Sequence, residues 1–219
     1  MSTTYFGPVQ WYQKLHRAEH VMIEQWESFQ KQTYRNRCLI ATTNGVQALT
    51  VPVESNSPLS TLHSPLIKDI RISDHGNWRH LHWNALQSAY GESPFFEYYQ
   101  DDIRPFFEKH WVFLLDFNEA IRQKMCELID IHPKVDYSGE WREESGERRV
   151  ERGEWREERG EFDGIKDYRA AINPKHPAQD DDFEAKTYYQ VYQMKHGFLE
   201  NLSILDLLFN MGPESIFYL

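Results

Sequence analysis

The stretch CLIATTNGVQALTVPV, residues 38–53, is the part of the sequence that most strongly constrains the fold. Two β-prone runs, residues 38–41 and 48–53, flank the segment Thr42-Thr43-Asn44-Gly45. Asn-Gly between two apolar runs is a strong hairpin signal, because both residues tolerate the positive φ that a tight turn needs. The stretch therefore predicts a β-hairpin.

Working outward, the flanking sequence predicts further strands and a first helix. Residues 10–16 have helical character, and Val21-Met22-Ile23 is typical of a short buried strand. Residues 66–72 alternate, with Ile70 and Ile72 on one face, and so predict another strand. A helix leading into a strand favours an α/β fold.

The second half of the chain predicts mainly helices. Boundary residues mark four of them, namely 77–91 with Asn77 as N-cap, 95–104 behind Ser93-Pro94, 111–128, and 202–209 between Asn201 and Gly212. We therefore predict a mixed α and β fold with a helical second half.

A tandem repeat interrupts this pattern. Gly-Glu recurs every seven residues, at Gly139, Gly146, Gly153 and Gly160. Apolar residues do not occupy the a and d positions, and each helical glycine costs about 1 kcal/mol, so a coiled coil is disfavoured. We predict a disordered charged insertion over 138–164, with 1–137 and 165–219 forming two parts of one domain.

Composition excludes several classes of protein. The 219 residues carry a net charge of -10, the wrong sign for coating nucleic acid or an anionic membrane. The two cysteines, Cys38 and Cys126, support neither a disulfide framework nor a zinc site. The sequence has neither a signal peptide nor a long apolar run, so it predicts a cytoplasmic protein that is not inserted in a membrane. It also predicts that the protein uses no metal.

The first candidate binding cluster is SFQKQTYRNR, residues 28–37. Three cations, Lys31, Arg35 and Arg37, lie among amides and hydroxyls, and such groups bind phosphate oxygens. The alternative is a solvated loop whose arginines pair with acids such as Glu24 or Glu27.

The second cluster is DHGNWRHLHW, residues 74–83, where a loop enters a helix. Helix N-termini favour anions, and Arg79 strengthens such a site. His80 and His82 point about 200° apart on a helix, so they cannot share one metal ion. His82 is a candidate general base, and a packed or surface histidine is the alternative.

Motifs of common enzyme classes are missing from the sequence. We find no Gly-rich phosphate loop, nucleophile elbow or zinc-protease helix. The aromatic runs 95–99 and 188–192 are more typical of packing than of stacking on a ligand.

Several blocks carry a family resemblance. They are YFGPVQWYQKL (5–15), FQKQTYRNR (29–37), LTVPV (49–53), NWR (77–79) with His82, SPFF (93–96) and LSILDLLFNMG (202–212). In these blocks the chain resembles the WbqC-like proteins of bacterial surface-polysaccharide gene clusters. In many members of the family an aspartate stands where this chain has Gln25. Members also often have a histidine-containing segment before the Tyr-rich block.

The resemblance implies a transferase that adds an acyl or aminoacyl group to an amino sugar carried on a nucleotide. The family opening also looks like nucleotide-binding α/β folds. A noncatalytic ligand-binding or scaffold protein of a polysaccharide assembly system is the alternative. Neither a cofactor nor an oligomeric state is predicted.

Combining the resemblance with the two clusters gives a set of expected roles. The diphosphate would be held by Lys31, Arg35, Arg37 and Arg79, while Tyr34, Asn36 and Trp78 orient the sugar or base. His82 or Asp206 would accept the proton of the attacking amine. Ser203, Asp206 and Asn210 lie on one helix face as a polar stripe, which makes Asn210 a candidate substrate contact.

Overall fold

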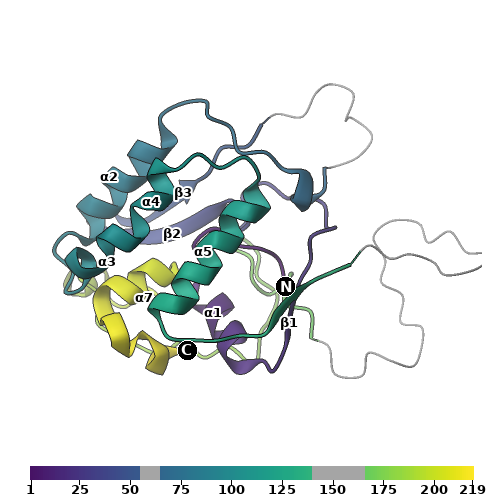
Figure 1. Ribbon diagram of the computed structural model, residues 1–219. Helices are drawn as coiled ribbons and strands as arrows, with labels where there is room; N and C mark the ends of the chain where they lie inside the picture. Colours follow the sequence, from purple (N-terminus) through teal and green to yellow (C-terminus); the bar gives the residue numbers. More distant parts are fainter. Residues whose placement is uncertain (55–64, 140–165) are drawn as a thin grey trace, which may run out of the picture.

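The structure is a computed structural model that describes residues 1–54, 65–139 and 166–219 (Figure 1). Of the predicted insertion over 138–164, the structure describes residues 138 and 139, and the rest lies outside the described residues. The strands are β1 (Val21–Ile23), β2 (Arg37–Thr42), β3 (Gly45–Thr50) and β4 (Val135–Tyr137).

Most of the remaining described elements are helical. The α-helices are α1 (Val9–Arg17), α2 (Trp78–Tyr90), α3 (Phe96–Ile103), α4 (Pro105–Glu108), α5 (Leu114–Leu128), α6 (Gln193–His196) and α7 (Ile204–Met211). Two 3₁₀ helices, η2 (Ile67–Asp69) and η3 (Gly212–Tyr218), complete the set. The predicted mixed α and β class is confirmed.

The predicted hairpin is present as β2 and β3. The two strands are antiparallel, with Arg37 opposite Thr50 and Thr42 opposite Gly45. Gly45 has a φ of 101°, which the tight turn requires and a side chain would resist. Figure 1 shows this hairpin near the middle of the molecule, and both α2 and α7 contact β2.

The second sheet joins distant parts of the chain. β1 pairs in parallel with β4, so that Val21 lies opposite Val135 and Ile23 opposite Tyr137. Both sheets in the described residues have two strands. The described residues thus lack the open parallel sheet of nucleotide-binding folds, and the predicted likeness to those folds finds no support in them.

The predicted strand over 66–72 is wrong. Residues 67–69 form η2, while Ile72 and Arg71 make isolated bridges to Val53 and Phe113. Ile70 and Ile72 are buried as expected, but their backbone lies in a turn and in isolated bridges rather than in a ladder of strand pairs. Phe113 bridges to Arg71 and the Val112 carbonyl accepts from the Ile72 N–H at 2.9 Å, so α5 starts at Leu114 and not at Trp111.

Two predicted helix caps also differ. Ser203, not Asn201, caps α7, and its Oγ accepts a hydrogen bond from the Leu205 N–H at 3.3 Å. Asn201 instead has a φ of 53° in the loop before it. The Ser93 hydroxyl donates to the Tyr90 carbonyl at 2.6 Å, and the N-cap of α3 is Phe95.

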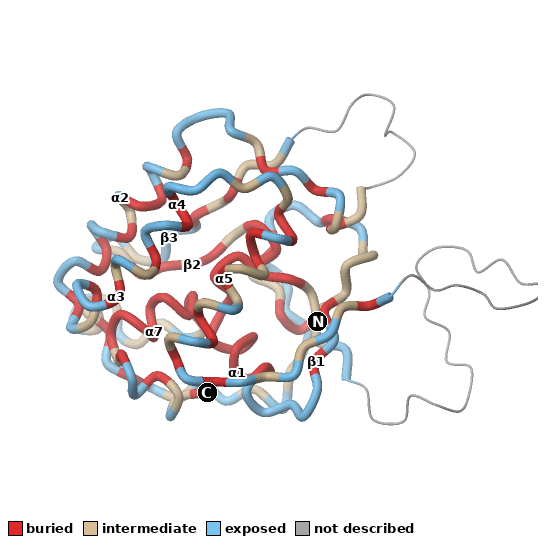
Figure 2. The backbone as a smooth tube through the Cα atoms, viewed as in Figure 1, coloured by how far each residue is buried: buried red, intermediate tan, exposed pale blue. Residues whose placement is uncertain are grey.

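The core contains residues from both sides of the undescribed segment 140–165. Six residues of α7 are 0% exposed, and Figure 2 shows this helix buried along most of its length. The Val9 N–H donates to the Leu202 carbonyl at 2.9 Å, and the Ile204 N–H donates to Gly7 at 2.8 Å. The N-terminal loop and α7 are therefore joined through the backbone.

A buried ion pair ties the segment after residue 165 to α1. Lys14 Nζ lies 2.9 Å from Asp180 Oδ1, and both side chains are 5% exposed. Gln10 donates to the other carboxylate oxygen at 2.7 Å, and Gln13 donates to the Glu184 carbonyl at 3.0 Å. Three side chains of α1 thus hold this segment. No helix in the described ranges has the length and apolar character to cross a membrane.

Candidate functional site: the first turns of α2

α2 lies along β2, and its two ends have different surroundings. At the first end, His82 is buried, with its Nδ1 2.9 Å from the Tyr5 hydroxyl and its ring 5.2 Å from that of Trp78. The imidazole also makes a hydrogen bond to the backbone of Thr50. Contacts from three segments therefore fix this ring in place.

Burial determines the charge of His82. It lowers the pKa to about 4, and the hydrogen bond to Thr50 only partly opposes this effect. The imidazole is therefore neutral at pH 7. A neutral imidazole can accept a proton, but its Nδ1 already has the Tyr5 hydroxyl as a partner.

Arg79 lies beside this histidine, in the first turn of α2. Its Nη1 donates to Asp74 Oδ1 at 2.8 Å, and its guanidinium stacks on the Trp78 ring at 4.7 Å. The Nε and Nη2 atoms are buried and have no hydrogen-bond partner among the described residues. Buried guanidinium donors without acceptors are rare, because leaving them unsatisfied costs about 1–3 kcal/mol or more.

Thr50 connects the hairpin to the same place. Its Oγ1 accepts a hydrogen bond from Arg37 Nε at 3.0 Å, while its backbone bonds to His82. The half-buried Arg37 is thereby joined to His82 through one residue. Arg37, Trp78, Arg79 and His82, four of the predicted site residues, thus form one connected cluster, which we call the α2 cluster.

Arg35 takes a different role from the predicted one. Its Nε and Nη2 donate to the two oxygens of Glu27 at 2.7 and 2.6 Å, and Nη2 also donates to Ser2 at 2.7 Å. The pairing with Glu27 is the one expected for a loop, but it is buried, with side-chain exposures of 6% and 8%. This guanidinium already has acceptors and is a structural bridge to the N-terminus.

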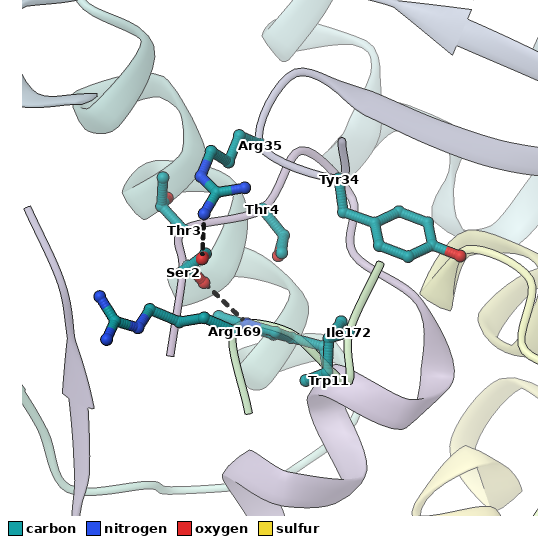
Figure 3. A pocket seen from close by; sticks show the side chains of 8 residues that line it. All are labelled: Ser2, Thr3, Thr4, Trp11, Tyr34, Arg35, Arg169 and Ile172. Atoms are coloured by element: carbon teal, nitrogen blue, oxygen red, sulfur yellow. Dashed lines mark hydrogen bonds between the residues drawn. The ribbon is translucent and has the colours of Figure 1, made fainter. Parts of the chain in front are cut away.

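The cavity beside Arg35 is too small for a sugar. It has a volume of about 10 Å³, which is room for about one water molecule. Figure 3 shows Arg35, Ser2 and Thr4 around it, with Arg169 and Trp11 on the other side. The Thr4 hydroxyl has no partner among the described residues, so a bound water would satisfy it.

The other residues of the first cluster are dispersed. Lys31 is exposed and makes no hydrogen bond or ion pair within the described part of the chain. Asn36 is buried and donates to the Val51 carbonyl at 2.9 Å. Tyr34 is buried, which raises its pKa to about 12. Asn36 and Tyr34 thus support the backbone that carries Arg37.

Asp206 of α7 contacts the far end of α2 and is completely buried. Its carboxylate accepts hydrogen bonds from Tyr90 at 2.9 Å, Tyr188 at 2.7 Å and Gln190 at 2.8 Å. Burial raises the pKa of Asp206 to about 6, although these three donors act in the opposite direction. Asn210 donates to the Asp206 carbonyl at 2.7 Å and accepts from the Val191 N–H at 3.1 Å.

The two candidate bases are therefore separated. His82 and Tyr90 stand at opposite ends of α2, about 12 Å apart along a helix that rises 1.5 Å per residue. The structure puts Asp206 and Asn210 in a network of their own, away from the α2 cluster. Among the described residues, no three acids, histidines or cysteines lie where they could together hold a metal ion.

The sequence predicted the central residues of the α2 cluster but not the residues that contact them. Tyr5 and Thr50 contact His82, and Asp74 contacts Arg79. Tyr5 lies 77 positions from His82, so no local pattern could connect the two residues. Asp206 did carry a signal in the sequence, since a charged residue within the apolar run ILDLLF, residues 204–209, requires buried donors.

Comparison with known proteins places these features in a family. The model of the WbqC-like protein family matches residues 3–218, nearly the whole chain. The chain belongs to the WbqC-like protein family. This WbqC-like chain is 26% identical over 202 residues to uncharacterized protein Rv1507c of Mycobacterium tuberculosis, covering 87% of the chain and 83% of that protein. No solved structure gives a significant match.

Proposed function

We propose that this WbqC-like protein is a transferase that modifies an amino sugar carried on a nucleotide, and that the α2 cluster holds the diphosphate. The unsatisfied Nε and Nη2 of Arg79 are the observation that carries this proposal. Phosphate oxygens are strong acceptors, and guanidinium donors match their geometry. A bound phosphate would remove the cost of burying these donors.

The surroundings of Arg79 fit an anion. The first N–H groups of a 13-residue helix and its positive dipole end lie beside it. Arg37, on the adjacent hairpin, provides a second cation, and the Trp78 ring already stacks with Arg79. Asp74 holds one side of the guanidinium, which fixes the orientation of the remaining donors.

The reaction requires that a neutral sugar amine attack the carbonyl carbon of an activated acyl or aminoacyl donor. An amide bond forms, the bond to the leaving group breaks, and the amine loses a proton. His82 is the neutral group of the α2 cluster. To accept that proton, its Nδ1 would exchange the Tyr5 hydroxyl for the substrate amine.

A thermal-shift experiment tests the binding step. UDP-N-acetylglucosamine, UDP and inorganic phosphate serve as probes, because a ligand at 100 times its Kd stabilises a protein by about 2.7 kcal/mol. We expect the nucleotide probes to raise the Tm, and Arg79→Gln to weaken binding at least tenfold, since a charge-assisted contact is worth about 1.5–3 kcal/mol. Arg104→Gln, which removes an exposed arginine paired with Glu108, is the control.

Failure would be clear in this design. If a panel of nucleotide sugars gave no shift, or if Arg79→Gln kept the shift of the unmodified protein, the diphosphate site would be refuted. Equal losses in both arginine variants would show a general charge effect instead.

The second candidate function is noncatalytic ligand binding within a polysaccharide assembly system. It is favoured by the fact that His82 and Asp206 both have protein partners and are 6% and 0% exposed. Mass spectrometry of a bound nucleotide amino sugar incubated with acyl donors separates the two functions. A new amide on the sugar supports the transferase, and saturable binding without any product supports the binding protein.

A further inference from the structure

A second candidate binding place is an open groove of about 410 Å³ on the flank of α5. Its walls are one stripe of α5, with Asp116, Glu119 and Gln123, and two residues from other elements, Gln25 after β1 and Tyr137 at the end of β4. Small-ligand sites have volumes of roughly 300–1,000 Å³. The groove is therefore large enough for a compact molecule.

The groove is distinct from the α2 cluster. Phe117 of α5 is buried and packs on Trp78, with ring centroids 6.2 Å apart. Asp116, by contrast, is exposed to solvent. The body of α5 thus separates the two places, and an inference about the groove does not rest on the proposed transferase function.

The carboxylates of the groove differ in their pairing. Glu119 accepts from Arg122 Nε at 2.7 Å and from Gln123 Nε2 at 2.7 Å, so its charge is already balanced. Asp116 makes no hydrogen bond or ion pair with any described residue. One negative charge therefore remains available at the groove.

The neutral groups supply further hydrogen bonding. The Gln25 amide nitrogen donates to the Ser138 carbonyl at 2.6 Å and that of Gln123 donates to Glu119, which leaves the two amide oxygens as acceptors. The Tyr137 hydroxyl is buried and is already engaged by the Glu119 carboxylate. The groove thus offers a carboxylate and two amide oxygens to a ligand.

We propose that this groove binds a small hydroxylated primary amine. The ammonium group would pair with Asp116, while hydroxyl groups would donate to the amide oxygens of Gln25 and Gln123. Leu115 and Ala120 provide the apolar part of the wall against which the carbon skeleton packs. An anion is disfavoured, because it would lie beside the Asp116 charge.

Isothermal titration with three matched probes tests this proposal on the full chain. Glucosamine carries an ammonium, whereas glucose and N-acetylglucosamine have the hydroxyls without the charge. We expect glucosamine to bind at least tenfold more tightly than either neutral probe, the loss expected for one charge-assisted hydrogen bond. Asp116→Asn should abolish this preference.

Three further variants keep the test decisive. Asp101→Asn removes an exposed acid of α3 that makes no ion pair with a described residue, and it should leave binding unchanged. Ala120→Phe should block the groove and remove binding of all three probes, with the circular dichroism spectrum of the folded protein retained. Arg79→Gln should leave glucosamine binding intact.

Several outcomes would overturn the proposal. They are the absence of saturable glucosamine binding, equal affinity for the charged and neutral probes, and undiminished binding in Asp116→Asn or Ala120→Phe. Loss of nucleotide-sugar binding in Arg79→Gln with no glucosamine binding in any variant would refute the groove and leave the α2 cluster standing.

Discussion

The two ends of α2 carry opposite kinds of polar chemistry. At the far end, every oxygen of the Asp206 carboxylate has a donor, and the Tyr90 hydroxyl also accepts from the Ala41 N–H at 3.1 Å. At the first end, Arg79 has two buried donors without acceptors among the described residues. Complete pairing is typical of a structural network, and incomplete pairing is typical of a place that awaits a ligand.

This contrast ranks the candidate residues in a way that residue type alone cannot. An aspartate in an apolar helix and an arginine at a helix start are both attractive functional candidates in a sequence. Their partners distinguish them, because a group that is already satisfied must break protein contacts before it can bind a substrate. The α2 cluster is accordingly the better candidate for function.

The largest effect is expected at the saturated end. Asp206→Ala leaves three buried donors, from Tyr90, Tyr188 and Gln190, without their acceptor. We expect the free energy of unfolding to fall by about 3–5 kcal/mol, as for other broken buried charge networks. Urea denaturation followed by circular dichroism measures this, with Asp101→Ala as the exposed control. A loss below about 1 kcal/mol would show that the network is not structural.

The pH dependence of stability sharpens the same contrast. The folded pKa of Asp206, about 6, is above its ordinary value of 3.8, so the folded state holds the proton more tightly than the unfolded state. The stabilisation is complete below about pH 4 and is lost as the pH rises through 6. Relative to Asp206→Asn, the unmodified protein should lose on the order of 2–3 kcal/mol between pH 4 and pH 7. Parallel unfolding curves for the two proteins over this range would contradict the raised pKa.

A smaller effect on stability is expected at the unsaturated end. Arg79→Gln removes one ion pair to a half-exposed Asp74 and two donors without described partners. Loss of the ion pair destabilises the fold by under about 1 kcal/mol, and removal of the unsatisfied donors opposes that loss, so the free energy of unfolding should fall by less than about 1 kcal/mol. The measurement is the same denaturation experiment without ligand. A loss comparable to that of Asp206→Ala would make Arg79 structural and would end the contrast between the two ends.

The smallest effect is expected from the repeat. The repeat sequence supplies charge but little apolar periodicity. Replacing residues 140–165 with a short Gly/Ser linker should lower the Tm by less than about 2 °C. Differential scanning calorimetry checks this, and a larger decrease would show that the repeat contributes to the folded domain.

Local signals in the sequence were sufficient for much of the fold. The Asn-Gly turn located the hairpin, and apolar periodicity located α1, α2 and α5 within a few residues. The prediction of a strand over 66–72 was wrong because alternation of apolar residues indicates only which side chains are buried. Residues can be buried in that pattern with single bridges, such as that between Val53 and Ile72, in place of a ladder. Periodicity alone cannot distinguish a ladder from a turn.

The candidate site was less predictable, for a physical reason. The sequence could indicate that Arg79 can bind an anion and that His82 can accept a proton. Which hydrogen-bond partners His82 already has depends on residues far away in the chain, such as Tyr5, 77 positions from it. Arg35 illustrates the same limit, because its charge suits a phosphate until Glu27 and Ser2 are seen to occupy it. Pairing is a property of the tertiary structure.

The buried Lys14–Asp180 pair has a consequence for how the chain can be divided. Together with the bonds between Gly7 and Ile204 and between Val9 and Leu202, it joins the parts before and after residues 140–165 through contacts that need no covalent link between them. Two separately expressed fragments, 1–139 and 166–219, have the complementary surfaces required to reassemble. We therefore predict that the two fragments, when mixed, reassemble into one folded unit and could serve as the halves of a split reporter.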